Sequence, residues 1–186
     1  SSFAVEDSAP LDLLRQAGAV IIPNPFGRRL NEAEILQHVR QADGLIAGLE
    51  PLNRKVLSAA PRLKALARVG VGMDNVDLEA AKDLGIKVSN TPDGPSEAVA
   101  EMTAAALLSL CRRIPASNAA MHEGQWLKLI GTGLAGLKVL IIGYGRIGQR
   151  VAALLRAFGC EILVFDPAVQ AGPAVHFVPL DEGLAQ

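Results

Sequence analysis

Glycines recur at the spacing Gly-x-Gly-x-x-Gly in two stretches of the chain, residues 131–136 and 143–148. This spacing binds a dinucleotide when it follows a strand and begins a helix. The backbone can then approach a pyrophosphate, and the first N–H groups of the helix can bind it. The spacing alone is a weak signal, so the flanking residues decide which stretch has this function.

The second stretch has the required flanks. The apolar run Leu137–Ile142 predicts a strand before it, and the helical pattern Arg146–Phe158 follows it and ends before Gly159. The first stretch only leads into this strand, and we interpret it as a loop. The predicted cofactor-binding glycines are Gly143, Gly145 and Gly148.

An aspartate extends this pattern. Asp166 directly follows the next predicted strand, Glu161–Phe165, at the spacing of about 20 residues that is typical of a carboxylate bound to the adenosine ribose. Its charge disfavours the 2′-phosphate of NADP, and no arginine follows it. The predicted cofactor is therefore NAD. The alternative is a tight turn for helix packing, with Asp166 as a surface residue.

A third glycine cluster, residues 70–74, follows the predicted strand Leu63–Val69. Ligands of open α/β sheets bind at the carboxyl ends of strands. The backbone N–H groups of this cluster are candidates to hold a carboxylate, with the charge of Arg68 beside them. A plain turn is the alternative, because the cluster lacks a third glycine.

Histidines provide no recognisable catalytic pattern. The chain has three, and neither a metal-binding spacing nor a Gly-x-Ser-x-Gly turn occurs. We expect His38 to be solvated, His122 to pack against or cap a helix, and His176 to lie at the edge of a core. The sequence therefore predicts no metal site and no catalytic residue.

The elements that position these residues follow from alternating apolar and amphipathic runs, which predict parallel α/β sheets. Further predicted strands are Phe3–Val5, Ala19–Ile22, Gly44–Ala47 and Ile86–Val88. Predicted helices are Asn31–Gln41, opened by a capping box of Asn31 and Glu34, a helix between Asp77 and Gly85, and Ser96–Arg113, buried on several sides and stopped by Pro115. The prolines and glycine of residues 90–95 predict a hinge between two domains.

Composition excludes several classes of protein. The 186 residues are 50% hydrophobic with a net charge of −1, which argues against disorder and against a basic surface for nucleic acid. The apolar stretch Ala98–Cys111 is shorter than the roughly 20 residues of a membrane span, and no export signal is visible. Cys111 and Cys160 are isolated, which favours a reducing cytoplasm. Trp126 is expected to be a packing anchor or a subunit contact.

The sequence resembles the NAD-dependent D-2-hydroxyacid dehydrogenase family, especially its phosphoglycerate dehydrogenase branch. The motifs that carry the resemblance are residues 67–77, 90–92, 98–101 and 143–148 with 165–167. It implies a flavodoxin-like substrate-binding domain, residues 1–94, and an incomplete Rossmann NAD-binding domain, residues 95–186, which also carries a homodimer contact. The substrate is expected to be a small 2-hydroxy or 2-oxo acid.

The resemblance also implies roles for individual residues. Val69, Gly70 and Val71 line the substrate carboxylate and nicotinamide region, Arg68 lies near the substrate and Asn90 supports the cleft. Arg146 and Ile147 cover the pyrophosphate through their backbone, and Asp166 holds the ribose.

Two departures from the family accompany the resemblance. The family's catalytic arginine, acidic residue and histidine normally lie further along than residue 186, so we expect this chain alone to be inactive. Gly48 stands where phosphoglycerate-type members tend to have an arginine that meets the substrate phosphate, and Arg28, Arg29 and Arg54 are candidate substitutes. The alternatives to an enzyme are a non-catalytic NAD-sensing module, resembling the C-terminal binding protein corepressors, and a structural partner that completes its sheet against another chain.

Overall fold

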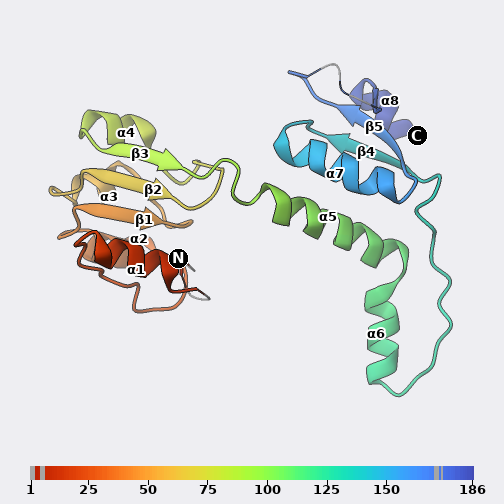
Figure 1. Ribbon diagram of the computed structural model, residues 1–186, viewed down its shortest axis with the longest axis horizontal. Coiled ribbons are helices and arrows are strands. Elements are labelled where there is room, and N and C mark those ends of the chain that lie inside the picture. The colour runs from red at the N-terminus through yellow and green to blue at the C-terminus, as the bar shows by residue number, and fades with distance from the viewer. Residues whose placement is uncertain (1–2, 5–6, 170–171, 173) are drawn as a thin grey trace. The chain divides into compact units, whose positions relative to one another are not determined.

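The computed structural model describes residues 3–4, 7–169, 172 and 174–186 (Figure 1). The chain divides into two compact units, residues 1–94 and 95–186. Each unit contains a parallel sheet with helices, so the predicted α/β fold class is confirmed. Among the described residues, no helix is long and apolar enough to cross a membrane.

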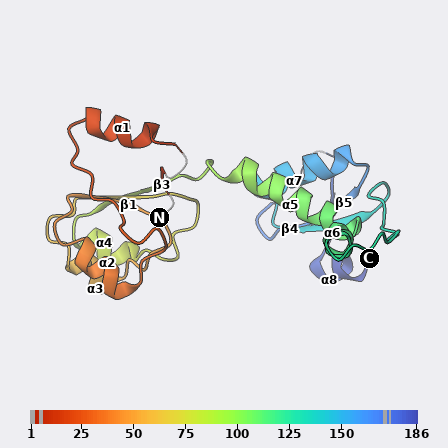
Figure 2. The ribbon, with the colours of Figure 1, turned by 90° about the horizontal axis from the view of Figure 1, so that it is seen from below.

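The first unit is built on a three-stranded parallel sheet in the order β1-β2-β3. These strands are β1 (Gly44–Ala47), β2 (Ala65–Arg68) and β3 (Lys87–Asn90). Its helices are α1 (Ala9–Gln16), α2 (Glu32–His38), α3 (Arg54–Ser58) and α4 (Leu78–Asp83). Figure 2 shows α2, α3 and α4 on one side of the sheet and α1 on the other. The buried core lies on the side of the three helices and includes Ile35, Leu52, Val56, Leu57 and Leu66.

The predicted helix caps of this unit are present. The Asn31 side chain accepts the Glu34 N–H at 2.9 Å, and the Glu34 carboxylate accepts the Asn31 N–H at 2.9 Å, which is a complete capping box. Asp77 accepts the Ala80 N–H at 2.8 Å at the start of α4. Gly85 follows this helix with φ +70°, a conformation that disfavours a side chain.

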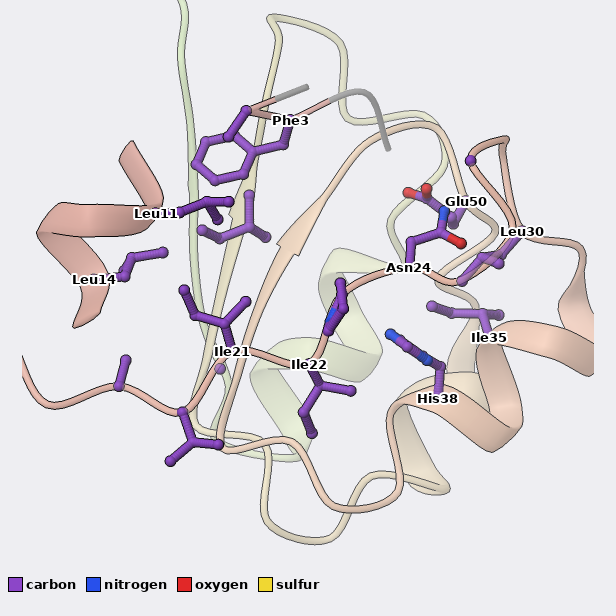
Figure 3. Close-up of a pocket in the computed structure, with 17 residues that line it drawn as sticks. Phe3, Leu11, Leu14, Ile21, Ile22, Asn24, Leu30, Ile35, His38 and Glu50 are labelled. Atoms are coloured by element: carbon purple, nitrogen blue, oxygen red, sulfur yellow. The ribbon is translucent and has the colours of Figure 1, made fainter. Parts of the chain in front are cut away.

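Two predicted strands of the first unit are not strands. Ala19–Ile22 is an irregular segment in which Val20 is 91% exposed, and Phe3 and Ala4 lie in a turn, whereas Val5 lies outside the described residues. An apolar run becomes a strand only where a neighbouring strand takes up its backbone hydrogen bonds. Segment 19–22 makes no such pairing with β1. It lines a cavity of about 440 Å³ together with Leu11 and Leu14 of α1, a helix for which the sequence analysis gave no bounds (Figure 3).

The second unit is built on a second parallel sheet in the order β4-β5-β6. Its strands are β4 (Lys138–Ile142), β5 (Glu161–Phe165) and β6 (His176–Phe177). Its helices are α5 (Ser96–Cys111), α6 (Ile114–His122), α7 (Arg146–Ala157) and α8 (Leu180–Ala185). Helices α7 and α8 lie on opposite sides of the sheet, and α5 packs against α7 (Figure 2). Residues 131–136 form the expected loop before β4.

The long apolar helix differs from its prediction in two respects. Helix α5 ends at Cys111, and Pro115 lies in the first turn of the separate helix α6, where a missing N–H costs nothing. Arg113, with φ +54°, turns the chain between the two helices. Only Ser96, Ala100 and Ala104 of α5 are buried, whereas Met102 is 69% exposed, so the helix is buried on one side and not on several.

Trp126 does not act as a packing anchor within this chain. It lies in the segment between α6 and β4 and is 83% exposed. The other part of the prediction, a contact with a second subunit, stays a prediction.

Helix α7 approaches strand β4 closely at its first turn. A Cβ atom at Gly148 would lie well inside van der Waals contact with the carbonyl oxygen of Gly143. Further along the helix, Val151, Ala152 and Leu155 are buried against the sheet. Because Gly148 has no side chain, the first turn of α7 can lie directly against the backbone of Gly143.

We predict that Gly148→Ala lowers the free energy of unfolding of the second unit by about 2 kcal/mol, because the new methyl group must displace backbone rather than a flexible side chain. Alanine's better helix propensity recovers only part of this loss. Urea unfolding followed by circular dichroism measures the effect. Gly133→Ala is the matched control, since a Cβ there meets nothing within 4 Å. Equal stabilities for the two variants would contradict the close-contact argument.

Candidate functional site

The turn between β4 and α7 has the geometry of an anion-binding loop. Gly143 leaves the strand with φ +97°, and its N–H donates to the Phe165 carbonyl at 2.8 Å, which ties the turn to β5. Gly145 is the N-cap of α7 in an extended conformation, and a Cβ there would meet nothing within 4 Å. Space beside the backbone at Gly145 is therefore open, whereas at Gly148 the protein's own backbone fills it.

The first turn of α7 presents N–H groups without acceptors inside the helix, as every helix N-terminus does. No side chain caps this helix, and its first turn contains no acidic residue. Arg146 and Ile147 are its first two residues. The helix dipole and these N–H groups make the turn suited to a phosphate group.

Asp166 holds this turn together from the end of β5. One carboxylate oxygen accepts the Tyr144 N–H at 2.6 Å, and the other accepts the N–H groups of Ala168 and Val169 at 2.7 and 2.9 Å. These bonds, led by that from Tyr144, hold the pKa of Asp166 below its usual range. Two carboxylate oxygens accept about four hydrogen bonds, so capacity for a hydroxyl donor remains.

Sequence reasoning did not identify the part played by Tyr144. Its ring is buried and packs edge-on against Phe177 at a centroid distance of 5.5 Å, and its carbonyl accepts the Gln149 amide at 3.0 Å. Tyr144 thereby links the turn to β6 and to α7. The glycine pattern allows any residue at position 144, so the sequence did not predict these contacts.

These features together fit NAD. The cradle beside Gly145 is open, the helix start is electropositive, and the Asp166 carboxylate is ionised at the end of the neighbouring strand. An ionised carboxylate there suits a ribose with free hydroxyls better than one bearing a phosphate.

A second cluster lies in the first unit, at the carboxyl ends of β2 and β3. Gly70 has φ +137°, and its N–H donates to the Thr91 hydroxyl at 2.7 Å. The Asn90 amide donates to the Val71 carbonyl at 2.8 Å. Asn90 and Thr91 therefore shape the loop after β2, and the role of Asn90 in supporting a substrate cleft stays a prediction.

The anion nest predicted for residues 70–74 loses one of its five N–H groups, that of Gly70, to the fold. The Val69 N–H donates to the Ala47 carbonyl at 2.8 Å, and the Gly70 N–H is taken by Thr91, so neither is available to a ligand. Among the described residues, the N–H groups of Val71 and Gly72 have no acceptor. The N–H groups of Met73 and Asp74 likewise have no acceptor there, so within the cluster only the N–H of Gly70 is taken up by the fold.

Arg68 is half-buried beside this loop. Its guanidinium donates to the Val69 carbonyl, and its buried Nε has no hydrogen-bond partner within the described part of the chain. The side chain forms no ion pair there, so its charge is available to an anion.

The histidines lie apart from both clusters. His38 is half-buried beside the cavity of Figure 3 rather than fully solvated, and His176 lies exposed on β6. His122 is the last residue of α6, and its Nδ1 lies 2.9 Å from the Asn118 carbonyl one turn earlier. No cluster of three or more metal-ligating side chains occurs within the described residues.

Comparison with known proteins gives one consistent group. The family model described as "D-isomer specific 2-hydroxyacid dehydrogenase, catalytic domain" matches residues 4–158. The chain is 37% identical over 177 residues to D-3-phosphoglycerate dehydrogenase from Rattus norvegicus, with 91% of this chain and 33% of that protein covered. The chain therefore spans about a third of the length of this curated relative.

Solved structures agree with this result. D-lactate dehydrogenase from Aquifex aeolicus, in complex with NAD and lactic acid, superposes with a TM-score of 0.80 at 26% identity, covering 96% of this chain and 55% of that one. NAD-dependent formate dehydrogenase from Staphylococcus aureus, in complex with NAD, has a TM-score of 0.80 at 30% identity, with the same coverage of both chains. With the family match over most of its length, the chain belongs to the D-isomer specific 2-hydroxyacid dehydrogenase family.

Proposed function

We propose that this chain supplies the substrate-binding and NAD-binding parts of an oxidoreductase that transfers a hydride between NAD and a D-2-hydroxy acid. The observation that carries the proposal is the turn from Gly143 to Gly148, tied to Asp166 at the end of β5. A helix-packing turn alone does not require an open cradle at Gly145 or an ionised carboxylate beside it. Both are what a dinucleotide requires.

On the second unit, the N–H groups at the start of α7 hold the pyrophosphate, at Arg146 and Ile147. Gly145 allows the close approach, and the remaining acceptor capacity of Asp166 binds the adenosine ribose hydroxyls. When bound, NAD supplies the hydride acceptor for oxidation of the substrate's CH–OH group.

On the first unit, we place the substrate carboxylate at the loop after β2. The free N–H groups of Val71 and Gly72 donate to it, and Arg68 contributes charge. Val69 and Gly70 shape the loop, and Asn90 holds it through the Val71 carbonyl. The substrate is a small 2-hydroxy or 2-oxo acid, and D-3-phosphoglycerate is a candidate through the rat relative.

We further propose that the working protein is a cytoplasmic homodimer. The outer face of α5 exposes Val99, Met102 and Leu110, and Trp126 is exposed nearby in sequence. A set of large apolar side chains on one face favours association with a second copy. Both cysteines are free thiols, which supports a reducing compartment.

We predict that the 186-residue chain binds NADH and that Gly145→Ser weakens binding at least about tenfold without loss of stability. Serine is a favourable N-cap, so the fold is retained, but its side chain enters the space required by the pyrophosphate. NADH fluorescence titration gives the affinity, and urea unfolding checks the fold. Unchanged affinity in a folded variant would place the cofactor elsewhere.

We predict that wild-type protein prefers NADH to NADPH and that Asp166→Asn reduces this preference to near unity.

Because hydrogen bonds lower the pKa of Asp166 in the folded state, the stability that its carboxylate provides is present above the unfolded pKa of about 4. It is lost as the pH falls through the lower folded pKa. The free energies of unfolding measured at pH 7 and at pH 3 should therefore differ less for Asp166→Asn than for wild type. Parallel pH profiles would contradict this.

We propose that this chain alone does not turn over substrate, because neither cluster contains a histidine to take the hydroxyl proton. The expected result is no NADH formation with D-lactate, D-malate or D-3-phosphoglycerate, under conditions in which NADH binding is measurable. Turnover by the 186-residue chain would show that the proton acceptor lies within it.

A further inference from the structure

The cavity of about 440 Å³ in the first unit is lined mainly by apolar side chains from four segments (Figure 3). Helix α1 contributes Leu11 and Leu14, the irregular segment before α2 contributes Ile21, α2 contributes Ile35 and β1 contributes Ile46. The volume lies within the range of roughly 300–1,000 Å³ that is usual for small-molecule sites. The cavity is therefore large enough for a small organic ligand.

A more polar pocket of about 370 Å³ adjoins this cavity at the start of β1. The lining residues common to both are Val20, Ile22, His38 and Gly44. Beyond them, the smaller pocket is lined by Gln41, Ala42, Asp43 and Arg62. The two pockets thus form one elongated space with an apolar end and a polar end.

We propose that this space binds an amphipathic small molecule, with an aliphatic body in the cavity of Figure 3 and an uncharged hydroxyl or amide head beside His38 and Gln41. The polar end lies at the start of β1, whereas the loops after β2 and β3 lie at the opposite, carboxyl edge of the same parallel sheet. The ligand is therefore neither the substrate nor NAD.

His38 is the polar group that both pockets share. It is the last residue of α2, and its ring points into the cavity in Figure 3. Within the described part of the chain, neither of its ring nitrogens has a hydrogen-bond partner. A neutral imidazole has one donor and one acceptor nitrogen. His38 can therefore either donate a hydrogen bond to a hydroxyl group or accept one from it.

The charges around the space disfavour an ionised head. Arg62 donates to both carboxylate oxygens of Asp43, at 2.7 and 3.2 Å, so these two charges compensate each other at the polar end. The Glu50 carboxylate is buried at the apolar end, where it accepts the Gly48 N–H at 2.7 Å, and it does not line the polar pocket. A charged head beside His38 would lose its hydration without gaining an unpaired opposite charge.

The apolar end has surface that the described residues leave exposed. No residue of α1 is buried, although Leu11 and Leu14 face the cavity (Figure 3). Where the two pockets meet, Val20 is 91% exposed and Ile22 is 53% exposed. Exposed apolar side chains gathered around a cavity are typical of a binding site. A bound aliphatic chain would remove this surface from water and so gain affinity.

The test is an NMR titration of the methyl groups of the 186-residue chain at pH 7. The probes are 1-octanol, octanoate and octylammonium, which share one aliphatic chain and differ in the charge of the head. We expect 1-octanol to shift the methyl signals of Leu11, Leu14 and Ile46. We expect it to bind at least about fivefold more tightly than either charged probe, because an uncharged head costs less to remove from water.

Two variants examine the two ends of the space. His38→Phe keeps a ring at this position and should weaken 1-octanol about fivefold, because one hydrogen bond is lost. His176→Phe is its matched control, since His176 is exposed on β6 of the other unit. Gly44→Val should abolish binding of 1-octanol by filling the junction of the pockets. The backbone accepts this change, because a Cβ at Gly44 meets only the Ala65 carbonyl oxygen, at 3.9 Å.

The proposal is overturned if 1-octanol leaves the three methyl signals unchanged, or if a charged probe binds as tightly as 1-octanol. It is also overturned if His38→Phe and His176→Phe behave alike, or if folded Gly44→Val binds 1-octanol as wild type does. A shift of the same signals with protein concentration alone would show that a second copy occupies the space, which also contradicts the proposal. The spectra report in the same experiment whether each variant is folded.

Discussion

The approach of helix α7 to strand β4 depends on residue 148 having no side chain. The Cα of Gly148 faces the carbonyl oxygen of Gly143, and a single methyl group would not fit between them. This contact brings the start of α7 to the end of β4, with its N–H groups directed beyond the strand. The cradle at Gly145 and the link from Tyr144 to Asp166 both follow from that placement. A larger residue at 148 would therefore disturb cofactor binding and folding together.

Both units use the same device to build a binding loop. In each, a glycine with positive φ ends a strand, and a polar side chain after the neighbouring strand fixes the loop. Gly143 and Asp166 form this pair in the second unit, and Gly70 and Thr91 form it in the first. Parallel strands make this arrangement general, because their carboxyl ends meet at one edge of the sheet. The loop N–H groups that the fold does not use are then directed at a ligand.

A single carboxylate, that of Glu34, has two structural contacts at the start of α2. Glu34 completes the capping box with Asn31 and at the same time binds Arg28. The guanidinium of Arg28, followed by the Asn31 N–H, holds the pKa of Glu34 below its usual range. The Glu34 carboxylate thus caps the start of α2 and also forms an ion pair with Arg28 of the preceding loop.

Local patterns in the sequence determined much of this protein. The glycine spacing, the position of Asp166, the capping box at Asn31 and strand β5 all depend on neighbours within one strand–turn–helix unit, and such rules can be read residue by residue. Tertiary structure alone decided the rest. Segment 19–22 is apolar enough for a strand but has no strand partner among the described residues. Pro115 lies in the first turn of α6, after Arg113 has turned the chain, and the N–H of Gly70 is taken by Thr91, which follows β3. Arg28, Arg29 and Arg54 are equivalent in sequence, and only contacts with Glu34 and Asp83 separate them. Each of these outcomes depends on which distant group satisfies a hydrogen bond or charge, and that is set by the fold rather than by local spacing.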